Sequence, residues 1–482
     1  MVGPKPAVNP NGLVGVLAFT GIVAALMQTL VVPLIGDLPQ ILDTTASNAS
    51  WIITATLVAG AVFVPITGRL GDLYGKRQML LACTVPLIAG SVVCALATSV
   101  VPMIAGRALQ GVGMGLIPIG ISALRDLLPA ERLNSSIALM SASMGIGGAL
   151  GLPIAAAVAQ GTSWRVLFWG ATVLSVAIAV LIWKFVPATP VDPDAGKFDP
   201  VGAIGLGIGL VCLLLGVSKG ADWGWASGTT LGLFAGAVVV LLAWGWWELR
   251  TSDPLVDLRT TARPQVLLTN VAGLVVGFAM YAQSLILPQL LQLPESTGYG
   301  LGQSMLVMGL WMAPGGFVMM ALAPVGAKLS SARGPKITLM VGALIIALGY
   351  GSSMLLMGSA WGLMIVACIC GAGTGFAYGA MPALIMSAVP HSETASANAF
   401  NTLSRSLGTS IAAAVVGVVL AQMSVQVGDY TLPTESGFRT GLLIGCGVAL
   451  VAAAVAACIP SRRPVPSAPA PAADGELVAA RG

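Results

Sequence analysis

The sequence predicts an all-α polytopic membrane protein with 14 membrane-spanning helices. Of its 482 residues, 56% are hydrophobic and only 8% are charged, whereas a soluble globular protein carries about 25% charged residues. The apolar residues form long runs, and the first run is too long for the core of a cleaved signal peptide. Short polar segments carry most of the charges, because a charge within hydrocarbon costs several kcal/mol.

Each long apolar run is interpreted as one span. The runs cover residues 13–35, 51–68, 79–98, 101–124, 134–159, 166–185, 201–217, 228–247, 265–291, 301–327, 337–357, 360–389, 395–423 and 442–459. A Pro- and Asp-rich linker follows the sixth span, and a second polar linker follows the eighth span. The order is therefore six spans, two spans and six spans.

The positions of lysine and arginine predict the orientation of the chain. With the N-terminus in the cytoplasm, 17 of the 22 cations fall in segments on that side. Three (Arg165, Lys219 and Arg439) fall on the outer side, and two (Arg107 and Arg405) lie within spans. Cytoplasmic loops are enriched in these residues, so we expect both termini in the cytoplasm. Cations scattered singly between apolar runs do not form a nucleic-acid-binding patch.

Two short segments recur along the chain in the same order. Residues 68–77, GRLGDLYGKR, join the second and third spans, and their charges predict a tight turn at the cytoplasmic face. Residues 326–336, GAKLSSARGPK, are a degraded copy of this segment at an offset of 258 residues. Residues 371–375, GAGTG, match residues 111–115, GVGMG, at an offset of 260. Similar offsets indicate a duplicated bundle.

These segments resemble motifs of the major facilitator superfamily of transporters. The segment 68–77 is similar to the loop after the second span in that family, and RALQGVGMG, beginning at Arg107, is similar to its fourth-span motif. The resemblance covers nearly the whole chain. It implies two parallel six-helix bundles related by an axis along the membrane normal, in a monomer of the bacterial inner or plasma membrane. We therefore expect a cytoplasmic segment at 1–12, bundles at 13–185 and 265–459, a two-helix insertion with linkers at 186–264, and a disordered cytoplasmic tail at 460–482.

The fifth span narrows the resemblance. It contains Gly145, Gly148, Gly151 and Pro153, and small residues spaced along a helix allow close packing of another helix. The stretch is similar to the antiporter motif of the superfamily, although Leu152 separates the usual Gly-Pro pair. Together with the 14 spans, it resembles the fourteen-span drug:proton antiporter branch. That resemblance implies export of lipophilic drugs or natural products by alternating access, in exchange for protons.

One departure from this branch concerns the coupling group. Its members carry an aspartate in the first span, two residues before a threonine, and here Met27 stands two residues before Thr29. The carboxylates of this chain lie in loops, at span ends or in the tail. The resemblance therefore implies coupling through Arg107, with Asp37 and Asp72 as the remaining carboxylate candidates. The other candidate gating or coupling cations are Arg69, Arg77 and Arg405.

The substrate cavity is expected to be largely apolar with a few polar and aromatic groups. Without a deep carboxylate, neutral, zwitterionic and anionic lipophilic compounds suit it as well as cations do. The candidate lining residues are Gln28, Thr29, Gln110, Tyr281, Gln283, Trp311 and Tyr378, and each could equally be a packing residue.

Other classes of function have less support in the sequence. All seven cysteines lie in apolar runs, where they are expected to be small core residues. Neither a metal-ligand cluster nor a catalytic set can be assembled, so we expect no metal, no cofactor and no enzyme activity. Two alternatives remain, namely an uncoupled facilitator or lipid-type translocator, and a membrane sensor or scaffold that has lost transport.

Overall fold

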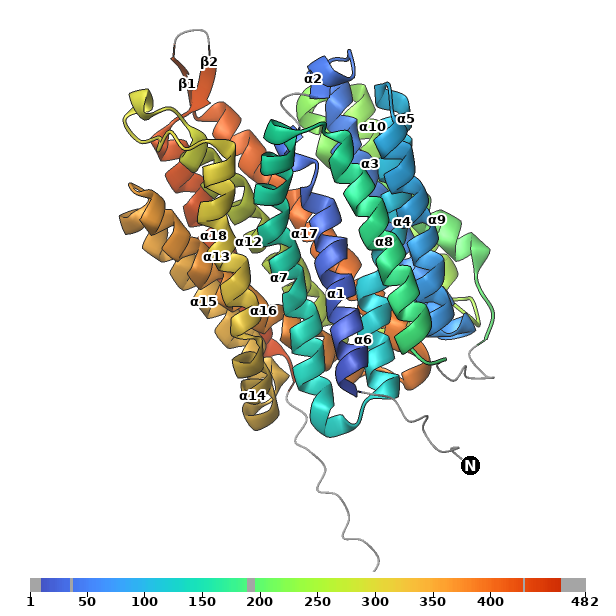
Figure 1. Ribbon diagram of the computed structural model, residues 1–482. Coiled ribbons are helices and arrows are strands. Elements are labelled where there is room, and N and C mark those ends of the chain that lie inside the picture. Colours follow the sequence, from blue (N-terminus) through green and yellow to red (C-terminus); the bar gives the residue numbers. More distant parts are fainter. Residues whose placement is uncertain (1–9, 35–37, 189–195, 428–429, 461–482) are drawn as a thin grey trace, which may run out of the picture.

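The computed structural model describes residues 10–34, 38–188, 196–427 and 430–460. Within these residues, 14 helices are long and apolar enough to cross a membrane, which confirms the predicted fold class. The long helices run roughly parallel to one another (Figure 1).

The chain alternates long helices with short connections. In chain order the elements are α1 (Pro10–Thr29), η1 (Val32–Leu34), α2 (Leu38–Ile41), α3 (Ala46–Tyr74), α4 (Lys76–Leu96), α5 (Val100–Val112), η2 (Gly113–Gly115), α6 (Leu116–Leu127), α7 (Ala130–Gly161), α8 (Arg165–Phe185), α9 (Pro200–Trp223), α10 (Gly228–Glu248), α11 (Leu258–Thr261), α12 (Pro264–Gln292), η3 (Glu295–Thr297), α13 (Met305–Ala321), α14 (Ala323–Arg333), α15 (Pro335–Leu356), α16 (Ala360–Met386), η4 (His391–Glu393), α17 (Thr394–Gln422), β1 (Ser424–Val427), β2 (Tyr430–Pro433) and α18 (Glu435–Cys458). The two strands pair antiparallel as a hairpin.

The expected turn at 68–77 is present but confined to Gly75, and the expectation that the whole segment forms it is wrong because most of the segment is helical. Helix α3 continues to Tyr74, Gly75 has φ 97°, and α4 begins at Lys76. The degraded copy has the same geometry, since Gly334 has φ 88° between α14 and α15. A positive φ is the conformation that only glycine adopts readily. Both sharp turns therefore depend on one glycine, and the charges lie on helix ends.

Two further expectations differ in detail. The first span was expected to continue to residue 35, but α1 ends at Thr29; Pro33 follows, and proline disfavours helix in the residue before it. Lys219 was expected in an outer turn, but it lies within α9 and is only 1% exposed. Its Nζ is 3.1 Å from Asp222 Oδ2 and lies 5.0 Å from the centre of the Trp51 ring.

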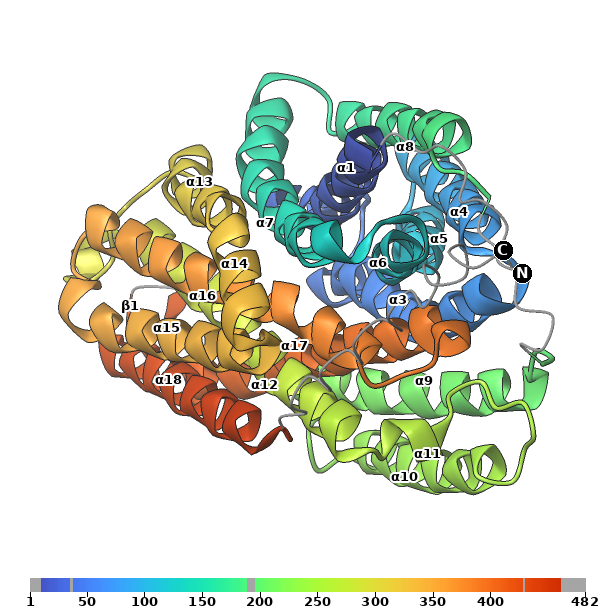
Figure 2. The same cartoon turned by 90° about the horizontal axis from the view of Figure 1, so that it is seen from below.

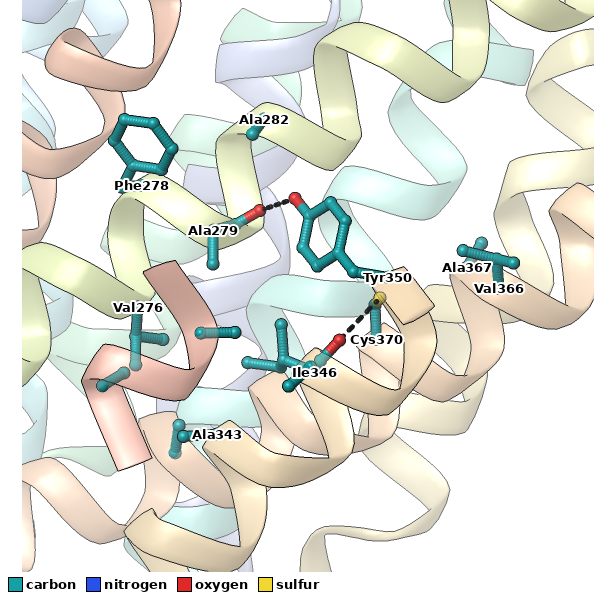
Figure 3. Packing of buried hydrophobic residues seen from close by; sticks show 14 of the residues in the cluster. Val276, Phe278, Ala279, Ala282, Ala343, Ile346, Tyr350, Val366, Ala367 and Cys370 are labelled. Atoms are coloured by element: carbon teal, nitrogen blue, oxygen red, sulfur yellow. Dashed lines mark hydrogen bonds between the residues drawn. The ribbon is translucent and has the colours of Figure 1, made fainter. Parts of the chain in front are cut away.

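Two large hydrophobic clusters form the interior. One is built mainly by α1–α8 and the other mainly by α12–α18; we call these groups of helices the N-terminal half and the C-terminal half. In the C-terminal half, the Tyr350 hydroxyl donates to the carbonyl of Ala279 and the Cys370 thiol donates to that of Ile346 (Figure 3). Both of these buried groups are thus satisfied by neighbouring backbone.

The helices α9 and α10 lie on the side of the bundle where α3 and α17 meet (Figure 2). A third hydrophobic cluster joins them to both halves. It includes Ala61 of α3, Leu210 of α9, Trp244 of α10 and Leu403 of α17. The inserted pair therefore packs against one helix from each half.

Candidate functional site

Helix α1 begins and α18 ends at the same end of the bundle (Figure 1), which we call the terminal face. At this face Asp72, near the end of α3, is only 4% exposed. Its Oδ1 accepts a hydrogen bond from the backbone N–H of Ala395 at 3.0 Å, and its Oδ2 accepts one from that of Ser396 at 2.8 Å. These N–H groups are in the first turn of α17, where a carboxylate also interacts favourably with the helix dipole. Asp72 of the N-terminal half therefore caps a helix of the C-terminal half.

Cations surround this cap. The Nζ of Lys76 lies 3.5 Å from Asp72 Oδ1 and 2.7 Å from Asp126 Oδ2. Arg125 donates to the Thr394 hydroxyl at 2.7 Å and to a carbonyl of the C-terminal half at 3.3 Å. Arg125 was not among the residues predicted from the sequence, because it directly follows the expected fourth span at 101–124 and only the fold brings it to the start of α17.

Close packing supports the same contact. A Cβ on Gly68 would overlap Ala399 and lie 2.9 Å from the carbonyl oxygen of Ala395. Helices α3 and α17 are therefore close enough for Asp72 to reach the α17 backbone.

The two other gate candidates of this segment differ from each other. Arg69 is 7% exposed and lines a cavity of about 230 Å³ together with Asp257, Glu393 and Ser396. Arg77 donates to the carbonyl of Trp183 in α8 at 2.6 Å. Arg69 therefore lies beside the α3–α17 contact, whereas Arg77 binds within its own half.

Arg107 is buried inside the N-terminal half and 2% exposed. It donates to the backbone carbonyl of Met27 at 2.9 Å, to that of Ile52 at 3.5 Å and to the side-chain oxygen of Gln110 at 2.7 Å. Gln110 in turn donates to the Ser91 hydroxyl at 2.9 Å. The guanidinium thus contacts the backbone of the residue at the position where the resembling branch carries its aspartate.

A cavity of about 10 Å³ lies beside Arg107, lined in part by Thr56, Gln110 and Met114. This volume is about that of one water-sized probe. The exposed side chain of Gln28 contacts the Met114 sulfur at 4.0 Å. The contacts therefore lead from the exposed Gln28 through Met114 to the cavity beside the buried Arg107.

The glycines of the fifth span pack α7 against helices on two sides. A Cβ on Gly151 would overlap the Thr29 hydroxyl of α1, and one on Gly145 would lie 2.6 Å from the sulfur of Met319 in α13. Pro153 lies against Gly309 of α13, where a Cβ would be 2.9 Å from the proline nitrogen. A Cβ on Gly148, in contrast, would meet nothing within 4 Å. Helix α7 thus joins the halves, and Gly148 is outside that packing.

Arg405 is the buried cation of the C-terminal half and 6% exposed. Its guanidinium carbon lies 4.3 Å from the centre of the Tyr378 ring, and it donates to the Thr402 hydroxyl at 3.1 Å. The Tyr378 hydroxyl lies 3.1 Å from the sulfur of Met280. Within the described residues, neither Arg107 nor Arg405 pairs with a carboxylate.

The remaining cavity candidates are spread over the C-terminal half. Tyr281 and Gln283 lie on α12 and are partly buried. Trp311 donates to Gln303 at 3.2 Å and packs edge-to-face on Trp361, which is 65% exposed. Trp311 therefore lies near the outer surface of the C-terminal half. It is not brought together with Arg405 and Tyr378. Asp37 lies outside the described residues.

An amide pair close to Arg405 was not predicted. Asn401 donates to the side-chain oxygen of Asn270 at 3.0 Å, and both residues are buried. Asn401 lies one helical turn before Arg405 on α17, but nothing in the sequence identified its partner on α12.

The fold and site define a multi-pass membrane protein made of two helical halves that contact each other at the terminal face. The profile of the Major Facilitator Superfamily matches residues 17–413. The chain therefore belongs to that family.

Relatives in bacteria carry transporter names. The chain is 27% identical over 342 residues to the "Uncharacterized MFS-type transporter YhcA" of Bacillus subtilis. These residues cover 71% of this chain and 63% of that protein. It therefore spans less than two thirds of that relative. It is 28% identical to the "Probable actinorhodin transporter" of Streptomyces coelicolor, over 86% of this chain and 73% of that protein. It is 27% identical to the "Tetracenomycin C resistance and export protein" of Streptomyces glaucescens, over 84% of this chain and 74% of that protein.

A solved structure shares the fold. The crystal structure of the human organic anion transporter MFSD10 (TETRAN) superimposes with a TM-score of 0.65 at 15% identity, covering 93% of this chain and 99% of that one.

Proposed function

We propose that the protein is a secondary active transporter that exports lipophilic small molecules by alternating access, in exchange for protons. It lies in the bacterial inner or plasma membrane as a monomer with both termini in the cytoplasm. The terminal face is then the cytoplasmic face, in agreement with its excess of lysine and arginine. The two halves are the two six-helix bundles, with 186–264 as the insertion.

The observation that carries this proposal is the cap that Asp72 forms on α17. It closes the cytoplasmic end with hydrogen bonds between the halves, and hydrogen bonds to a charged group contribute about 1.5–3 kcal/mol each. Contacts of this strength hold one end shut but can be replaced by water when the halves separate. A transporter that exposes its cavity alternately to each side needs such a reversible closure.

Relatives and cavity chemistry suggest the class of substrate. The names of two relatives refer to actinorhodin and tetracenomycin C. The candidate lining residues of the C-terminal half are Arg405 and Tyr378, which stack on each other, and the partly buried Tyr281 and Gln283. A guanidinium, two phenols and an amide suit neutral or anionic aromatic compounds at least as well as cations.

The proposal includes the coupling of transport to protons. Arg107 is buried against the Met27 carbonyl beside a water-sized cavity, so it is placed to respond to a change of hydration or charge in α1. A second candidate function is the uncoupled facilitator. It is favoured by Met27, because the methionine at this position cannot carry a proton as an aspartate would.

Transport in liposomes distinguishes the two candidates. Purified protein is reconstituted with a pH dye inside, a proton gradient is imposed, and aromatic anions, neutral compounds and lipophilic cations are added. Substrate-dependent proton flux that is lost in Arg107→Ala or Asp37→Asn, while binding survives, supports antiport. Substrate movement without proton flux supports the facilitator, and binding without movement supports the sensor or scaffold.

A further inference from the structure

The inserted helices bring two carboxylates together at the terminal face. Asp199 is the N-cap of α9 and Glu248 is the last residue of α10. A Cβ placed on Gly202 would overlap both Asp199 Oδ2 and Glu248 Oε1, so both carboxylates lie against the same turn of α9. Asp199 is 6% exposed and Glu248 is 2% exposed. Two acidic groups therefore share a site that excludes water.

The two carboxylates have different partners. Asp199 accepts hydrogen bonds from the backbone N–H of Gly202 and from the indole N–H of Trp247, each at 2.9 Å. Among the described residues, neither oxygen of Glu248 has a hydrogen-bond partner, and the buried indole nitrogen of Trp244 has none either. Asp199 is thus held by two hydrogen-bond donors, whereas Glu248 is not.

The surroundings of Glu248 offer no positive charge. Helix α9 presents Asp199, α10 presents the Trp244 indole, and the connection 249–257 presents the backbone amides of Leu255 and Val256. Asp199 is the charged group that faces Glu248 from these elements. A carboxylate that is buried next to a second carboxylate, without a cation, is more stable when it is neutral.

We propose that Glu248 and Asp199 form a proton-binding site in which Glu248 holds the proton and Asp199 holds the negative charge. The ligand is a single proton, taken from and returned to water at the terminal face. On release, the O–H bond of Glu248 breaks, the proton passes to water, and a carboxylate remains. The proposal concerns proton binding alone, so it stands or fails independently of transport.

Release of the proton has a structural consequence for the connection 249–257. The new carboxylate requires donors, and those beside it are the Trp244 indole and the amides of Leu255 and Val256. The other side of this connection, at Asp253 and Asp257, lines the 230 Å³ cavity shared with Arg69 and Ser396. The proton site therefore acts on a segment that adjoins the α3–α17 contact.

Infrared spectroscopy of the full chain in lipid, without substrate, tests the site. As the pH rises from about 5 to about 9, the wild type should lose the carbonyl band of one buried, protonated carboxyl group. Glu248→Gln should lack this change, and Glu295→Gln, a matched change of an exposed carboxylate, should retain it. An identical pH-dependent band in the wild type and in Glu248→Gln would overturn the proposal.

A second variant keeps the test decisive if Glu248→Gln does not fold. Asp199→Asn retains an N-capping side chain but removes the neighbouring negative charge. The Glu248 band should then disappear at a pH lower by about one unit. An unchanged titration would show that the carboxylates are not a pair. The measurement is repeated with sodium replacing choline as the buffer cation. A band that changes with this replacement would indicate a metal-cation site and would also contradict the proposal.

Discussion

Two of the contacts between the halves have opposite chemistry. At the terminal face, α3 and α17 are joined by the Asp72 carboxylate and two backbone N–H groups. Between α7 and α13, the contact is made by glycines, with Gly316 against the carbonyl of Gly145 and Gly309 against Pro153. Water can replace a polar contact, whereas a contact between backbones depends only on shape. The comparison suggests that α3–α17 opens and closes while α7–α13 serves as the pivot.

The largest effect is expected from breaking the glycine contact. In Gly316→Val the new side chain would overlap the Gly145 carbonyl and Ala149, and overpacking of this kind costs about 3 kcal/mol. Thermal unfolding in detergent should show a correspondingly lower melting temperature. The matched control is Gly148→Val on α7, where a Cβ meets nothing within 4 Å. Equal destabilisation by both variants would contradict the role of this contact.

A smaller effect is expected from the polar contact. Asp72→Asn keeps the shape of the side chain but removes its charge, which should weaken the cap on α17 by about 2 kcal/mol. Hydrogen–deuterium exchange of a peptide spanning 394–400 should accelerate about 30-fold. Glu131→Gln, which changes an exposed carboxylate, should leave the exchange unchanged. Unaltered exchange in Asp72→Asn would show that the cap does not hold α17.

The smallest effect is expected from the hydrogen bond between Arg125 and Thr394. Its donor is charged and half-buried, so Thr394→Val should cost about 1 kcal/mol and accelerate exchange at the start of α17 about fivefold. A double-mutant cycle with Arg125→Ala isolates this bond. The loss in the double variant should be smaller than the sum of the two single losses, and strictly additive losses would show that the two side chains are not coupled.

Composition, the length of the apolar runs and the positions of the charges were enough to predict 14 spans, because long apolar runs separated by charges have few other solutions in a bilayer. Residues 68–77 were misjudged as a turn because their charges were taken to need water. The structure instead satisfies Asp72 with N–H groups of α17, a partner more than 300 residues away that no local pattern reveals.

Contacts within one helix of the candidate site could be predicted from the sequence, whereas contacts between helices could not. Arg107 and Gln110 share one helix face, so their contact follows from spacing. The stacking of Arg405 on Tyr378 joins two helices, and the burial of Glu248 beside Asp199 depends on how α9 and α10 pair. Glu248 appeared in sequence as the first residue of a polar linker, which is why its burial was missed.

The most direct test of the account is the distance across the terminal face. Spin labels carried by non-canonical amino acids at Tyr74 of α3 and Ala332 of α14, both exposed, avoid the exposed thiol of Cys458. Pulsed electron resonance in lipid should give one narrow distance distribution in the wild type and an added population of longer distances in Asp72→Asn. An unchanged distribution would contradict the claim that Asp72 holds this face closed.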